Sequence, residues 1–245
     1  MMNLKVELMA GAGLALAALA LVVAVPLNGR AHAQEPRPVD ATGAPLAPDV
    51  DPHTLSRLPL PTPAELGPTA PLRNGQPAPT DEPQRLYSPK LAEAMNAAHR
   101  YVKYESGIDD RLTAIAVLVT ARMANSQFEW TRWEMHGRRP GDTKVQPEIV
   151  DIIKYCKPVV GLPPKETAII NLGRETFGPT DKVSSATYAD AVRLFGRQGV
   201  VDLVDLMGLY KITAMEIKAF DARLDPKAYK PLLPPMSATP LCRGV

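Results

Sequence analysis

Proline is the residue that most limits how this chain folds. The sequence has 245 residues and 26 prolines, and fourteen of these prolines lie between Pro36 and Pro89. Each proline fixes its own φ angle and removes a backbone donor, so this stretch cannot form long helices or a continuous sheet. We therefore expect residues 34–86 to form a Pro-rich extended arm. Its leucines, such as Leu55 and Leu58, indicate that part of the arm packs on the globular body or on a neighbouring subunit.

The first 33 residues have the order of a secretory signal. Lys5 precedes an uncharged, mostly aliphatic stretch from Leu8 to Asn28, and Ala31-His32-Ala33 supplies the small residues of a cleavage site. We expect a signal peptide over residues 1–33, a mature chain that begins at Gln34, and a periplasmic or secreted location in a bacterium. Membrane contact is then confined to this segment before cleavage. The alternative is an uncleaved anchor, since the stretch approaches the roughly 20 residues that span a bilayer.

The spacing of apolar residues becomes helical after Tyr87. Hydrophobic residues make up 45% of the sequence and aromatic residues only 5%, a balance that favours a helical core over a strand-rich one. Apolar positions recur at intervals of three and four, and prolines and polar caps mark the helix starts. We predict an all-α bundle of about seven helices over residues 87–225 and a Pro-rich tail over 226–245. The predicted helices are Pro89–Tyr104, Asp110–Arg122, Gln127–His136, Pro147–Cys156, Pro164–Phe177, Ser185–Arg197 and Gly199–Ala222.

Charge and metal-ligating residues exclude several kinds of site. The 28 basic and 26 acidic side chains leave a net charge of +2, so we expect no nucleic-acid partner. Cys156 and Cys242 are too few for a Cys-rich zinc site or a Cys-x-x-Cys redox centre, although a disulfide between them stays open. After residue 33 the histidines are His53, His99 and His136, and their spacing is not that of a metal site. We expect no cofactor, and we expect His99 at a helix surface or an interface.

Three chemically useful side chains share one face of the predicted helix Gln127–His136. Glu129, Trp133 and His136 are spaced i, i+4 and i+7, so a carboxylate, an indole and an imidazole form one stripe. About 10.5 Å of helical rise separates Glu129 from His136, which suits the two ends of a small substrate. Two plainer interpretations stay open. Glu129 can complete a capping box with Ser126, and His136 can complement the helix dipole.

Five segments of the chain follow one another in a distinctive order. They are Arg111–Arg122, Ser126–Trp130, Pro147–Asp151, Lys182–Tyr188 and Gly199–Tyr210. Together they resemble the carboxymuconolactone decarboxylase family of the alkylhydroperoxidase-like superfamily, over roughly Leu58 to Leu224. The resemblance implies an all-α fold, assembly as a trimer or hexamer, and lyase chemistry on a small carboxylate or lactone.

The chain also departs from the pattern of the family it resembles. Relatives carry Glu-Trp-x-x-His, and the position of that histidine is Trp133 here. His136 lies about 4.5 Å further along the helix axis, which makes a different site. The peroxidase-reductase branch needs Cys-x-x-Cys, which is absent from this sequence, so we do not expect reductase activity.

Two functions fit this sequence. The first is an exported decarboxylase-like or lactone-converting enzyme in which Glu129 and His136 are catalytic. Its substrate-binding residues are Arg122, Trp130 and Trp133, with Arg122 anchoring a carboxylate and Glu129 or His136 returning a proton. The second is a non-catalytic oligomeric ligand-binding protein that keeps the scaffold, because an indole at Trp133 enlarges an apolar wall and cannot transfer protons.

Overall fold

The computed structural model describes residues 37–66, 72–73, 76–77, 84–141 and 144–234. The chain divides into Met1–Pro36, which lies outside the described residues, and a second unit that begins at Arg37. The predicted signal segment, the cleavage site before Gln34 and the last part of the tail also lie outside the described residues. Within the described part, no helix combines the length and the apolar character needed to cross a membrane.

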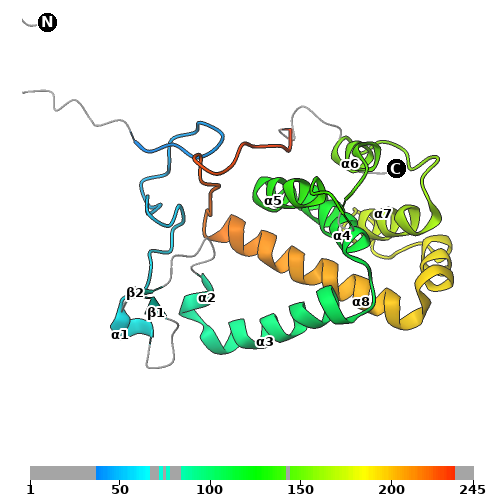
Figure 1. The fold of residues 1–245 in the computed structure, drawn as a ribbon, viewed down its shortest axis with the longest axis horizontal. Coiled ribbons are helices and arrows are strands. Elements are labelled where there is room, and N and C mark those ends of the chain that lie inside the picture. The colour runs from blue at the N-terminus through cyan, green and yellow to red at the C-terminus, as the bar shows by residue number, and fades with distance from the viewer. Residues whose placement is uncertain (1–36, 67–71, 74–75, 78–83, 142–143, 235–245) are drawn as a thin grey trace, which may run out of the picture. The chain divides into compact units, whose positions relative to one another are not determined.

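The regular secondary structure of the second unit is almost entirely helical in the described residues (Figure 1). Its elements are α1 (Pro63–Leu66), β1 (Leu72–Arg73), β2 (Gln76–Pro77), α2 (Gln84–Tyr87), α3 (Pro89–Arg100), the π-helical turn η1 (Tyr101–Glu105), α4 (Asp110–Met123), α5 (Gln127–Gly137), α6 (Pro147–Lys154), α7 (Pro164–Thr176) and α8 (Ser185–Ala219). This confirms the all-α class for the described residues. The antiparallel pair β1–β2, in the arm, is only two residues long.

Local signals account for the helix starts. Pro89, Pro147 and Pro164 open α3, α6 and α7, where a missing N–H costs nothing. The Asp109 carboxylate accepts a hydrogen bond from the backbone N–H of Leu112 at 2.8 Å and so caps α4. These starts agree with the predicted ranges.

Two of the predicted helices form one element. The sequence predicted a break between Arg197 and Gly199, and within α8 (Ser185–Ala219) two helical segments meet close to that point, at a kink at Gly196. Gly196 has φ +70° and ψ 172°, a conformation open to glycine because it has no Cβ. The helical backbone is therefore interrupted at this one residue, and the second segment leaves in a new direction.

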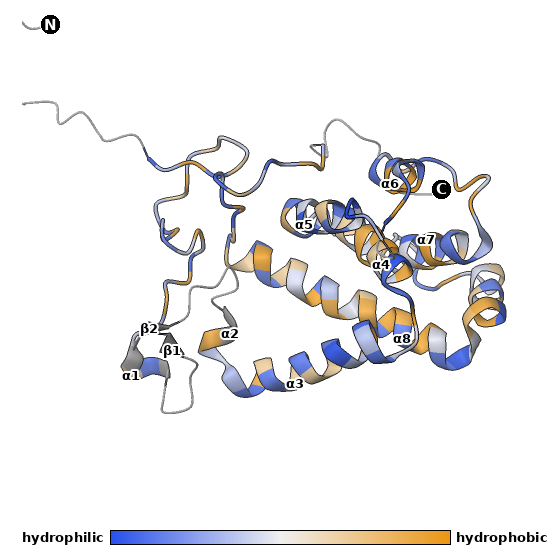
Figure 2. Ribbon diagram, viewed as in Figure 1, coloured by the Kyte–Doolittle hydropathy of each residue, from blue (hydrophilic) through white to orange (hydrophobic). Residues whose placement is uncertain are grey.

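Helix α4 is the centre of the core. Every residue from Leu112 to Arg122 is buried, and α5, α6, α7 and α8 all pack against this helix. The approach of α7 is close at Gly173, where a Cβ would lie 2.6 Å from Val119 Cγ1. A helix with so few polar residues is predicted from its sequence to be central, and the burial of α4 confirms this; Figure 2 shows its hydrophobic colouring.

One face of α8 is apolar and exposed. The apolar residues of the predicted helix Gly199–Ala222 are all expected in the core from their spacing. Leu203, Leu206 and Met207 are indeed buried, whereas Val201, Val204 and Met215 are exposed. The predicted core was too wide because α4 and α7 cover only one side of this helix. Helix α3 has no buried residue at all.

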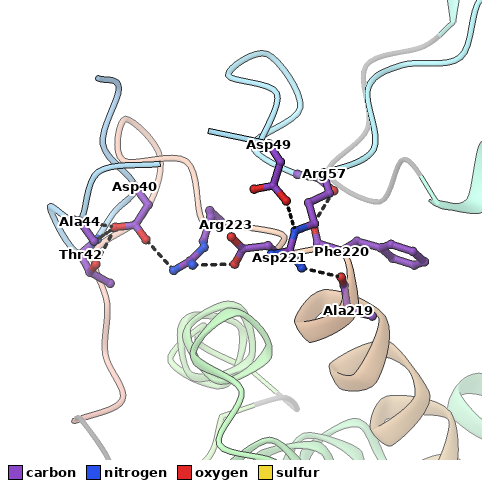
Figure 3. Close-up of polar contacts among 10 residues, drawn as sticks. Asp40, Thr42, Ala44, Asp49, Arg57, Ala219, Phe220, Asp221 and Arg223 are labelled. Atoms are coloured by element: carbon purple, nitrogen blue, oxygen red, sulfur yellow. Dashed lines mark hydrogen bonds and ion pairs between the residues drawn. The ribbon is translucent and has the colours of Figure 1, made fainter. Parts of the chain in front are cut away.

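The arm packs on the end of α8 (Figure 3). The Ser56 hydroxyl and the backbone N–H of Arg57 both donate to the Phe220 carbonyl, at 3.1 and 2.7 Å. The Arg57 guanidinium donates to the Ala219 carbonyl at 3.2 Å. These bonds satisfy carbonyls that a helix end leaves without a partner. We call the contacts of residues 40–57 with residues 219–224 the clasp.

An ion-paired arginine completes the clasp. Arg223 lies 3.1 Å from the Asp40 carboxylate and 2.6 Å from that of Asp221. Burial works to raise the pKa of Asp40, but hydrogen bonds from Thr42 and Ala44 and the charge of Arg223 outweigh it and hold that pKa below its usual value. The arm is therefore part of the folded body over these residues.

Cys156 is not a free thiol, because it is disulfide-bonded. The other cysteine in the sequence, Cys242, lies outside the described residues. Thiol titration under denaturing conditions checks the bridge to Cys242 that the sequence leaves open, because two reactive thiols would mean that no such bridge exists.

Candidate functional site

A cavity of about 360 Å³ is lined by residues from three helices, α3, α5 and α8. Helix α5 contributes Glu129, Trp133 and His136 to its wall. The i, i+4, i+7 stripe predicted from the sequence thus faces one cavity. The structure brings the carboxylate, the indole and the imidazole together.

Glu129 does not form the reciprocal half of a capping box. The Ser126 hydroxyl accepts a hydrogen bond from the backbone N–H of Glu129 at 3.3 Å, as in an ordinary N-cap. The backbone N–H of Ser126, which the carboxylate would bind in a capping box, donates instead to the Ala121 carbonyl at 2.9 Å. The capping-box interpretation is therefore wrong in its second half, and the carboxylate borders the cavity.

Four aromatic rings from three elements line the cavity in a row. His99 of α3 meets Tyr210 of α8 edge to face at 5.2 Å between centroids, and Tyr210 meets Trp133 at 5.2 Å. Trp133 in turn meets His136 at 4.9 Å. Edge-to-face pairs hold rings in fixed relative positions, so these contacts set the direction of each polar ring atom.

The cavity wall carries more positive than negative charge. Lys103 of η1, Arg132 of α5 and Arg139, which follows α5, line it together with Glu129. The Lys103 ammonium lies 4.9 Å from the centroid of the Trp133 ring, a cation–π distance. Such a wall favours an anionic ligand.

The surroundings of His136 favour its neutral form. Burial lowers its pKa first, and the charges of Arg139 and Lys103 lower it further, against a smaller opposing effect of Asp110. A neutral imidazole has a nitrogen that can accept a proton. The dipole interpretation of His136, which needs the charged form, is therefore weakened.

Two predicted substrate-binding residues do not border this cavity. Trp130 is fully buried, and its indole N–H donates to Glu134 at 2.6 Å. Arg122 is buried at the end of α4, and burial lowers its pKa. Trp130 is rotated about 100° around α5 from Glu129, which turns it to the core.

Sequence reasoning missed part of the wall. Met95, His99 and Lys103 recur every fourth residue and all line the cavity, so their spacing was a usable signal. His99 was expected at a helix surface or an interface, and that expectation did not include its hydrogen bond to Tyr210 at 3.0 Å. The helical spacing of Gly199–Ala222 marks Tyr210 only as a core residue.

Comparisons with protein-family models, curated proteins and solved structures find no match to this chain.

Proposed function

We propose that this protein binds a small carboxylated or lactone molecule in the cavity and acts on it by acid–base chemistry. The observation that supports this most is the joint presence of Glu129 and a neutral His136 in a wall that also carries Lys103, Arg132 and Arg139. The resemblance of the sequence to carboxymuconolactone decarboxylases supports the same class of substrate.

Each group has a natural task in such a reaction. The cations bind the substrate carboxylate and orient it. The imidazole of His136 takes up or returns a proton, and Glu129, at the other end of the stripe, exchanges the second proton. The indole of Trp133 lies between them as a flat apolar wall that keeps water from the reacting atoms. No cofactor enters this scheme.

The alternative is a ligand-binding protein without catalysis. Trp133 favours this alternative, because Trp133 stands where members of the family that the sequence resembles carry histidine. Both functions are tested by titrating carboxymuconolactone into the protein calorimetrically and by following its absorbance for turnover. Binding with turnover supports the enzyme, binding alone supports the alternative, and no binding contradicts both.

The cations give this test its specific variants. We expect Lys103→Ala and Arg139→Ala each to weaken binding of carboxymuconolactone by roughly tenfold or more, since a hydrogen bond to a charged group is worth about 1.5–3 kcal/mol. Arg193→Ala is the matched control, because Arg193 is exposed, pairs with Asp190 at 2.9 Å and does not line the cavity. Equal loss in the control variant would count against a charged site.

We also propose a homo-oligomer, a trimer or hexamer. Val201, Val204, Ile212 and Met215 are exposed along α8, an apolar stripe of the kind that a neighbouring copy covers. Sedimentation should show a trimer or a multiple of it, and Val204→Asp should shift it to monomer. Val160→Asp is the control, since Val160 is 77% exposed in the loop before α7. A wild-type monomer at every concentration contradicts the assembly.

A further inference from the structure

We propose that a second cavity extends the proposed site, and that the ligand is an elongated carboxylic acid whose apolar chain occupies this second cavity. The inference rests on the proposed function and narrows its substrate class. The carboxylate end is bound in the cavity described above, here called the first cavity, and the chain runs along the seam between α5 and α8.

The second cavity has a volume of about 480 Å³. It is lined by the end of α4, the start of α5, the end of α8 and the clasp. Its apolar side chains are Met123, Phe128, Ala214, Ile217 and Leu224. A wall of this composition suits a hydrocarbon chain.

Most polar groups that line the second cavity already have partners. At its clasp end, drawn in Figure 3, Arg223 pairs with Asp40 at 3.1 Å and with Asp221 at 2.6 Å. The Thr42 hydroxyl donates to Asp40 at 2.6 Å, and the Ser126 hydroxyl caps α5. A hydrocarbon chain in the cavity therefore leaves none of these groups without a partner.

The two cavities follow one another along the same two helices. On α8, Tyr210 and Thr213 line the first cavity. Ala214 and Ile217, further along the same helix, line the second. These positions recur at intervals of three and four, so they lie on one face of α8. On α5 the first turn lines the second cavity and the stripe from Glu129 to His136 lines the first.

Phe128 and Arg132 meet where the two cavities adjoin. Phe128 lines the second cavity and Arg132 lines the first, and the guanidinium carbon of Arg132 lies 5.4 Å from the centroid of the Phe128 ring. The boundary is therefore a contact between side chains of neighbouring turns of α5. Because long side chains change rotamer quickly, a ligand chain passes this boundary without a movement of the backbone.

The charges and the dimensions set the orientation and the length of the ligand. Lys103 and Arg139 line the first cavity and bind the carboxylate. Arg139 follows the last residue of α5, whereas the second cavity lies at the first turn of this helix, so the chain of a bound acid extends along α5. The seven-residue step from Tyr210 to Ile217 rises about 10.5 Å, about the length of an extended ten-carbon acid.

The test compares two acids that differ only in chain length. Hexanoate and decanoate carry the same carboxylate, and calorimetry measures the affinity of each. We expect the wild-type protein to bind decanoate about 80-fold more tightly, from a gain of about threefold for each of the four added CH₂ groups. Lys103→Ala should weaken binding of both acids by a similar factor, because it removes a cation from the carboxylate end.

A substitution that fills the second cavity should remove this preference. Ala124 follows α4, Ala222 follows α8, and both are partly buried and line the cavity. In Ala124→Trp and in Ala222→Trp, decanoate should bind only as tightly as hexanoate, and the affinity for hexanoate should stay the same. Ala189→Trp is the matched control, because Ala189 is exposed on α8 and lines neither cavity.

A crystal of the wild-type protein soaked with 10-bromodecanoate locates the chain directly. The anomalous signal of the bromine should lie beside Ile217. This measurement needs no substitution, so it gives the decision if a tryptophan variant does not fold, as shown by its melting curve. A bromine on the exposed apolar stripe of α8, or anywhere else outside the second cavity, overturns the inference.

Each result of the calorimetry also decides the inference. Equal affinity of the wild-type protein for both acids overturns it, as does a decanoate preference that survives in folded Ala124→Trp and Ala222→Trp; the first cavity then still stands as a carboxylate site. Carboxymuconolactone binding without binding of either acid overturns this inference alone. If none of the three ligands binds, the proposed function fails and this inference fails with it.

Discussion

Glu129→Gln and His136→Ala should each lower turnover of the carboxylate or lactone substrate about 100-fold or more, the usual loss for a general acid or base. Both side chains line the same cavity, and neither substitution removes a group from the core of α4. Initial-rate assays at saturating substrate measure the loss of turnover.

The pH dependence of the same reaction follows from His136. Its pKa is lowered by burial and by the charges of Arg139 and Lys103, so the imidazole is already in its basic form at neutral pH. If it acts as the base, kcat/KM should be level through neutral pH and fall only below the usual range of histidine.

Trp133→His should weaken binding without raising the rate, because the indole forms part of the wall. Full activity in both Glu129→Gln and His136→Ala would remove these residues from catalysis.

Lys154→Met should lower the free energy of unfolding by about 3–5 kcal/mol, because it leaves a buried carboxylate without its main partner. Glu134 is 2% exposed, and the Lys154 ammonium lies 2.9 Å from its carboxylate. Trp130 donates to the same carboxylate, and Arg138, which is mostly exposed, pairs with it. Urea denaturation measures the loss. Arg193→Met, which breaks an exposed pair, is the control and should cost less than about 1 kcal/mol.

Two further measurements identify the charge as the cause. The double variant Glu134→Leu with Lys154→Met should recover much of the stability, since no unpaired charge is then buried. Burial tends to raise the pKa of Glu134, but hydrogen bonds from Lys154, Arg138 and Trp130 outweigh it and lower that pKa below 4.5. The contribution of Glu134 to the free energy of unfolding is therefore complete above the pKa of its unfolded state, and it is lost as the pH falls through the pKa of the folded state. A Lys154→Met protein as stable as wild type would contradict this account.

The sequence predicts most strongly those features that a single turn of helix determines. Pro147 and Pro164 start α6 and α7 because a proline suits a first helical position, and Asp109 caps α4 with its own side chain. The Glu129–Trp133–His136 stripe likewise depends only on helical periodicity. These features need no information from distant parts of the chain.

What the sequence misses depends on contacts between distant residues. His99 looks like a surface residue because α3 buries nothing, and only its contact with Tyr210 of α8 brings it to the cavity. Arg122 looks suited to bind a carboxylate, yet the packing around α4 buries it outside the cavity wall. The turn at Leu55, with φ +52°, is set by the arm's fit to the end of α8 and not by a local preference.

The clasp joins the two ends of the described body into a closed loop. Asp40 and Arg223 are 183 positions apart in the sequence, and Ser56 and Phe220 are 164 apart. Contacts of such high sequence separation form late, because the chain between them must already be compact. Because closure entropy grows only with the logarithm of loop length, this long loop costs little more than a shorter one. A chain shortened from either end therefore loses the same hydrogen bonds and the same Asp40–Arg223 ion pair.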